Sequence, residues 1–126
     1  MMASPTHHAR IDRTPRAPAE ARRMVEALPL DPATAEAVRL VVSELVSNAV
    51  MHGTGAIAVT LATGPEGVRV SVSDDGAGFP RSREPVMPPP DAPGGRGLAL
   101  VSKLSARWGV EPGDPTRVWC VIPVSR

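Results

Sequence analysis

The sequence predicts an α+β fold, a two-layer sandwich in which a mixed, mostly antiparallel sheet is covered on one face by about three helices. Two observations lead to this prediction. Residues 57–61 and 68–73 alternate apolar with small or polar residues across a Gly64-Pro65 turn, which is typical of a β-hairpin with one apolar face. Helical patterns lie before and after this hairpin. Because only one face is apolar, we expect helices on that face and water on the other.

The N-terminal segment is expected to be a tail followed by a helix. Residues 1–16 have no sustained hydrophobic period, so we expect a tail there. A short strand near Arg10–Asp12 could form within this tail. Residues 17–126 are then expected to form one domain, in keeping with the length of the chain. Apolar side chains in residues 18–28 recur three and four positions apart, and Pro29 follows them. This segment is predicted to be an amphipathic helix.

A second, longer helix is predicted to follow. Asp31 is a good N-cap residue, and Pro32 suits the first helical position. Apolar residues then run almost unbroken from Ala33 to Met51. We expect a mostly buried helix that ends near Gly53.

The last third of the chain predicts a loop, a helix and two strands. Residues 80–93 contain six of the 15 prolines, so no regular element is expected there. A helical pattern follows Gly94-Gly95 and continues to Leu104. Residues 108–110 and 118–122 are predicted strands, and the second is apolar on both faces, which favours a position inside the sheet.

Composition excludes several classes of protein. The net charge of +1 provides no strong field to steer the chain onto nucleic acid or an anionic membrane. A single cysteine, Cys120, excludes an internal disulfide and a multi-thiolate zinc site, and it is expected to be a small core residue. No apolar run is long enough to cross a bilayer, and a secretion signal is not evident, so we expect a cytoplasmic protein. The three aromatic residues are too few to form the core, which should be aliphatic.

The first candidate site is the pair Glu44 and Asn48, one helical turn apart on the same side as Leu40, Val41 and Met51. Burying an unpartnered carboxylate costs several kcal/mol, so Glu44 should face a partner or a wet cavity. In a cavity, the Asn48 amide oxygen could bind Mg²⁺ and Glu44 could accept or orient a proton. The alternative is a hydrogen-bonded structural pair, which E-x-x-x-N taken alone favours.

The second candidate is the segment Asp74–Gly78, directly after the second hairpin strand. Strand parity places Asp74 on the same inward face as Val70 and Val72. A carboxylate there could accept a hydrogen bond from an exocyclic amine such as that of adenine, and the glycines would let a ring approach the backbone. An ordinary turn with Asp75 in solvent explains the same residues equally well.

The third candidate is the glycine-rich start of the last helix, residues 94–98. Free backbone N–H groups and the helix dipole favour phosphate at such a position. A flexible loop end is the alternative. The usual nucleotide fingerprints are missing, because the chain has no G-x-x-x-x-G-K-[ST] and no G-x-G-x-x-G.

In order, the three motifs resemble the Bergerat-fold ATP-binding superfamily, which includes gyrase, heat-shock chaperone ATPases and histidine kinases. The segments Ser43–Val50 and Gly95–Val101 look more closely like the anti-sigma-factor serine kinases of bacterial partner switching. The pairs Trp108-Gly109 and Val118-Trp119 extend this resemblance, which covers roughly residues 18–124. It implies a Bergerat fold and a histidine kinase-like ATP-binding domain.

The resemblance also implies roles for individual residues. Glu44 would be the catalytic base, Asn48 the Mg²⁺ ligand and Asp74 the adenine contact. The remaining implied nucleotide contacts are Gly76, Gly78, Gly95, Arg96, Gly97 and Leu98, with residues 80–93 as the ATP lid. The family often has Thr immediately before its Val-Trp pair, whereas this chain has Arg117 there and Thr116 one place earlier. A shift of one residue reverses the face of a strand, so the part of Thr116 in binding adenine depends on the register. The family also often has a basic residue at the position of Met51.

The implied function is that of an ATP-binding serine protein kinase and anti-sigma regulator that uses Mg²⁺ and phosphorylates an antagonist protein in trans. Its expected partners are an anti-anti-sigma-type antagonist and a sigma factor, with no direct contact to nucleic acid or membrane, and a homodimer is left open. The alternative is an ATP-sensing, protein-binding switch without significant kinase activity. A sensor-kinase fragment that works with a separate dimerisation protein is a weaker third hypothesis.

Overall fold

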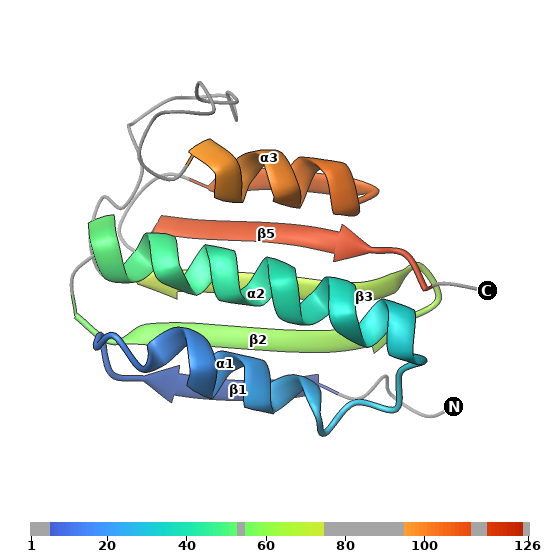
Figure 1. Cartoon of the computed structure of the whole chain (residues 1–126), viewed down its shortest axis with the longest axis horizontal. Helices are drawn as coiled ribbons and strands as arrows, with labels where there is room; N and C mark the ends of the chain where they lie inside the picture. The colour runs from blue at the N-terminus through green and yellow to red at the C-terminus, as the bar shows by residue number, and fades with distance from the viewer. Residues whose placement is uncertain (1–5, 53–54, 75–94, 112–115, 125–126) are drawn as a thin grey trace.

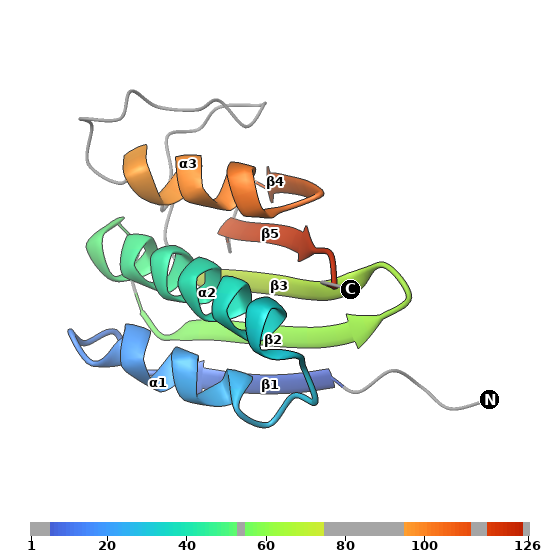
Figure 2. The same cartoon turned by 45° about the vertical axis from the view of Figure 1, so that its right-hand side comes forward.

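The computed structural model describes residues 6–52, 55–74, 95–111 and 116–124. They form a two-layer α+β sandwich, as the sequence predicts, with all three described helices on one side of a five-stranded sheet (Figures 1 and 2). None of these helices is both long and apolar enough to cross a membrane. In chain order the elements are β1 (Thr6–Ile11), α1 (Ala17–Val25), α2 (Pro32–His52), β2 (Ile57–Gly64), β3 (Gly67–Asp74), α3 (Gly95–Leu104), β4 (Arg107–Glu111) and β5 (Thr116–Ile122).

The sheet has the order β1-β2-β3-β5-β4, and each of its pairings is antiparallel. The expected mixed sheet is therefore corrected to an antiparallel one for the described strands. The reason is the position of β5: β4 runs in the same direction as β3, but β5 lies between them. The prediction that the last strand is interior is confirmed.

The predicted hairpin is formed by β2 and β3. Its register pairs Val59 with Val72 and Leu61 with Val70, and all four side chains are buried under the helices. At the turn, Gly67 has a φ of 130°, and a Cβ there would overlap the Ile122 carbonyl oxygen. Only glycine fits this position, because other residues rarely adopt positive φ and would also clash.

The segment expected to be a tail contains a full edge strand. Six residues form β1 and pair with β2, from Thr6 opposite Ala62 to Ile11 opposite Ile57. The strand starts earlier than the short one considered near Arg10–Asp12. Its inward positions are His7, Ala9 and Ile11, so the apolar alternation is weak, and pairing with β2 forms the strand.

The helices start close to the predicted positions. The backbone N–H of Thr34 donates to the Asp31 carboxylate at 3.1 Å, which confirms the N-cap of α2. Hydrogen bonds from the side chain of Thr34 and, second, from its backbone lower the pKa of Asp31. Helix α1 is shorter than predicted and buries only small or β-branched residues, Ala17, Ala21 and Val25.

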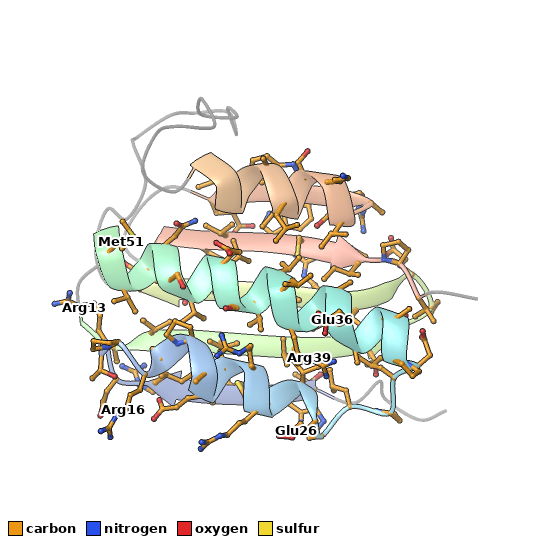
Figure 3. All side chains as sticks on the ribbon, in the orientation of Figure 1. Arg13, Arg16, Glu26, Glu36, Arg39 and Met51 are labelled. Carbon is orange, nitrogen blue, oxygen red and sulfur yellow. The ribbon has the colours of Figure 1, made fainter. Side chains whose placement is uncertain are left out.

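The core is aliphatic, as predicted. It is built from the buried side of α2 and the inward side chains of β2, β3 and β5, and Trp108 is a partly buried aromatic residue against it. Cys120 is fully buried within this core, and burial raises the pKa of its thiol to about 11. By contrast, Met51 is 61% exposed at the end of α2 (Figure 3).

Candidate functional site

One end of the sandwich gathers the segments that carry the predicted motifs. At this end α2 and β3 finish, and β5 and α3 begin (Figure 1, left). Helix α2 contacts β3, β5 and α3, and Asp74 at the end of β3 pairs with Thr116 at the start of β5. Motifs that lie far apart in the sequence therefore meet at one end of the fold.

Asn48 lies on α2 and is almost completely buried, with 3% of its surface exposed. Its amide nitrogen Nδ2 has no hydrogen-bond partner among the described residues. An unsatisfied buried polar group costs about 1–3 kcal/mol, and native structures contain few of them. A half-turn of the amide would present its oxygen at the same point. The side chain therefore fits a ligand that would take up this free position.

Glu44 lies one helical turn before Asn48 and is partly exposed. Its carboxylate makes no ion pair with another described residue. The apolar neighbours of Glu44 on α2 raised the question of whether its carboxylate is buried without a partner. Because Glu44 is partly exposed, water reaches the side chain and the cost of burying a charge is avoided. A carboxylate in this position is free to accept a proton from a bound group.

Two arginines from the N-terminal part of the chain attach to α2 on either side of this pair. Arg22 on α1 donates from Nη1 to Ser43 Oγ at 2.8 Å, directly before Glu44. Arg13 donates from Nη1 to the Val50 carbonyl at 3.4 Å, in the last turn of the helix (Figure 3). Neither contact could be predicted from the sequence, because a basic residue in an exposed segment has no local pattern that identifies its partner.

Asp74 is the last residue of β3 and is 5% exposed. It continues the inward face of Val70 and Val72, as strand parity predicts, and is paired with Ile57 on one side and Thr116 on the other. A buried carboxylate at the end of an apolar face is a directional hydrogen-bond acceptor in otherwise apolar surroundings. Gly76 and Gly78 lie outside the described residues.

The register decides which β5 residue stands beside Asp74. Thr116 is directly opposite Asp74, and Arg117 is opposite Ser73. Arg117 occupies the position where the family often has Thr, and Thr116 lies one place earlier. The register puts the backbone of Thr116, and not that of Arg117, in the same row as Asp74. Arg117 is exposed, with its Nη1 3.8 Å from a Glu111 carboxylate oxygen.

The phosphate-binding motif predicted at residues 95–98 forms the first turn of α3. Backbone N–H groups in the first turn of a helix have no partner within the helix, and they lie at the positive end of its dipole. Val101 is buried in the core and holds α3 beside α2. The residues expected to form the lid, 80–93, lie outside the described part of the chain.

This combination of fold and site defines an α+β domain whose candidate site lies at the end built from α2, β3, β5 and α3. Residues 8–120 match the family described as histidine kinase-like ATPase domain. The chain belongs to this family, and membership implies ATP binding. The match spans most of the described strands and all three helices.

Two solved structures are similar over most of the chain. The RsbU and RsbW domains of Rv1364c from Mycobacterium tuberculosis align at a TM-score of 0.73 and 25% identity, covering 97% of this chain and 33% of that one. The histidine kinase domain of the blue-light activated histidine kinase EL346 from Erythrobacter litoralis aligns at 0.56 and 25%, covering 86% and 58%. This chain thus spans about a third of the first structure and more than half of the second. No curated protein sequence matches it.

Proposed function

We propose that this domain is an ATP-dependent serine protein kinase and anti-sigma regulator that phosphorylates an antagonist protein in trans. The observation that carries the proposal is the pair on α2: a buried Asn48 amide with a free position, one turn from a partly exposed Glu44. This pair lies within Ser43–Val50, the segment that resembles the anti-sigma serine kinases. The similarity to the RsbU and RsbW domains supports the same assignment.

In this proposal Asn48 and the nucleotide hold Mg²⁺. The described residues contain no cluster of three or more histidine, cysteine, aspartate or glutamate side chains that could bind a metal by themselves. Mg²⁺ in nucleotide sites usually takes one or two protein ligands and completes its shell with phosphate oxygens and water. A single amide oxygen from Asn48 agrees with that pattern.

The other residues would position the nucleotide. Asp74 accepts a hydrogen bond from the adenine amine, and Thr116 in the same row lies beside it. Gly76 and Gly78 shape the adenine pocket. The first turn of α3, with Gly95, Arg96, Gly97 and Leu98, binds the phosphates through its backbone N–H groups.

The transfer step then needs only a proton acceptor and correct alignment. The serine hydroxyl of the antagonist attacks the γ-phosphorus, its proton goes to the Glu44 carboxylate, and the bond to the β-phosphate oxygen breaks to release ADP. Alignment and Mg²⁺ provide most of the rate acceleration. A sigma factor would be the second protein partner, bound when the antagonist is phosphorylated.

The test compares wild type with Glu44→Ala. Both proteins are incubated with labelled ATP, Mg²⁺ and a small anti-anti-sigma-type protein, and ATP affinity is measured by calorimetry. Loss of a general base should lower serine labelling on the order of a hundredfold or more while ATP affinity is kept. Glu36→Ala is the matched control, because Glu36 is exposed on the same helix and pairs with Arg39.

Two outcomes would refute the kinase proposal. Equal labelling by wild type and Glu44→Ala would remove Glu44 from the reaction. ATP binding without any labelled serine in the wild type would favour the alternative, a protein-binding switch that senses ATP without transferring its phosphoryl group.

A further inference from the structure

The sheet has a second face, opposite the three described helices (Figure 2). The register sets its side chains in rows across the strands; one such row runs His8, Thr60, Ser71, Trp119, Gly109. On this face Arg69 is the large side chain of β3, and the other side chains along β2 and β3 are small. They are Ala58, Thr60, Ala62, Ser71 and Ser73. The centre of this face is therefore a depression in the surface, and larger side chains flank it.

The low centre is a hollow of about 330 Å³. It has room for roughly ten waters at about 30 Å³ each, or for a few side chains of a partner. His8 on β1 lines one side, and Arg69 and Arg117 line the other. The floor supplies hydroxyl groups that donate or accept hydrogen bonds, and the walls are cationic or titratable.

The walls of the hollow are held in place before anything binds. The Arg69 guanidinium carbon lies 4.8 Å from the centroid of the Trp119 ring, a cation–π contact. Trp119 in turn lies over Gly109, where an added Cβ would be 3.0 Å from the indole nitrogen. His8 Nδ1 is 2.9 Å from Thr60 Oγ1. Groups fixed in this way lose little entropy when they bind a partner.

The charge of this face selects the kind of partner. Arg107 pairs with Glu66 at 2.6 Å, and Arg117 lies 3.8 Å from Glu111. Arg10 and Arg69, also exposed on this face, have no ion pair with any described residue, so the described residues of this face carry an excess of positive charge. A second copy placed face to face would bring like charges together, whereas an acidic segment is complementary.

We propose that this hollow docks an acidic segment of a partner protein. The backbone of the segment lies over the small side chains of β2 and β3. One of its carboxylates sits between Arg69 and Arg117, and the hydroxyls of Ser71 and Ser73 donate to it. Asp74 and Thr116 lie on β3 and β5, the strands that carry Arg69 and Arg117, but at the proposed nucleotide end, so the two sites are separate surfaces on shared strands.

The test uses a fluorescein-labelled peptide in which glutamate alternates with serine, and its affinity is measured by anisotropy at low salt. Arg69→Glu and Arg117→Glu should each weaken binding about tenfold or more. Arg23→Glu is the matched control, because Arg23 is exposed on α1 and its reversal changes the net charge equally. Ser71→Leu fills the hollow without changing charge and should also abolish binding. Thermal unfolding checks that each variant is folded.

A second measurement needs no variant. Addition of the peptide to the wild type should shift backbone amide resonances of β2 and β3 and leave those of α1 unchanged. Equal weakening by all three charge reversals would overturn the proposal, because it indicates attraction to net charge alone. Shifts confined to the helices, or a wild-type dimer that Ser71→Leu dissociates, would also overturn it, the latter by showing a second copy on this face.

Discussion

Replacing Asn48 by leucine should make the protein more stable and unable to bind Mg²⁺·ATP. Leucine has the same number of side-chain heavy atoms as asparagine, branched at the same carbon, and it removes the buried Nδ2 that has no partner among the described residues. Removing an unsatisfied polar group should raise the free energy of unfolding by about 1–3 kcal/mol. Losing any hydrogen bond made by the amide oxygen should lower it by about 1 kcal/mol. We expect a net gain of about 1 kcal/mol, or about 4 °C in Tm.

The order of stability should reverse when nucleotide is added. At a hundredfold excess of ATP over its Kd, ligand binding stabilises the wild type by about 2.7 kcal/mol, whereas the variant should gain almost nothing. The assay is urea or thermal unfolding with and without Mg²⁺·ATP. Ser47→Leu, next in the same helix, is the control that removes the part due to the helix propensity of leucine.

Either of two results would show that Asn48 does not have this role. A loss of 1 kcal/mol or more in Asn48→Leu without nucleotide would mean that the amide is satisfied and structural, as the E-x-x-x-N pattern alone would suggest. An unchanged shift on adding Mg²⁺·ATP would show that Asn48 takes no part in nucleotide binding.

Three further predictions concern other residues. Asp74→Asn should weaken ATP binding by about tenfold, because an amide can turn a donor toward the adenine amine, and calorimetry that finds equal affinity would contradict the adenine contact. The Cys120 thiol has a pKa raised to about 11 in the folded state, so its contribution to stability should be intact below about pH 9 and decline between pH 9 and 11; by urea unfolding, the difference in stability between the wild type and Cys120→Ala should be constant below about pH 9 and change only in that window. The N-cap lowers the pKa of Asp31, so Asp31→Ala should destabilise the protein above the unfolded pKa, and the difference should shrink as acid protonates Asp31; a difference that stays constant down to pH 2 would contradict the charged cap.

Local patterns predicted the elements that depend on local chemistry. The Asp31-Pro32 start of α2 and the inward parity of Val70 follow from neighbouring residues, and the structure confirms both. β1 is different, because its strand forms through pairing with β2 and its own alternation is weak. An antiparallel edge strand that contains two histidines has little in its sequence to distinguish it from a tail.

The candidate site also combines features that local sequence predicts with features that depend on tertiary structure. The order of the motifs and the helical spacing of Glu44 and Asn48 could be read from the sequence. The partner of Thr116 could not, because β5 pairs with β3 across more than 40 intervening residues and the register depends on that pairing. The hollow between Arg69 and His8 also needs the order of the strands, since the two residues lie on β3 and β1 with β2 between them.

The most direct test of the proposed function is mass spectrometry of the anti-anti-sigma-type protein after incubation with this chain and Mg²⁺·ATP. We predict one phosphoserine that forms with the wild type and is reduced on the order of a hundredfold with Glu44→Ala, at equal ATP occupancy. An unmodified antagonist in the presence of wild type saturated with ATP would contradict it.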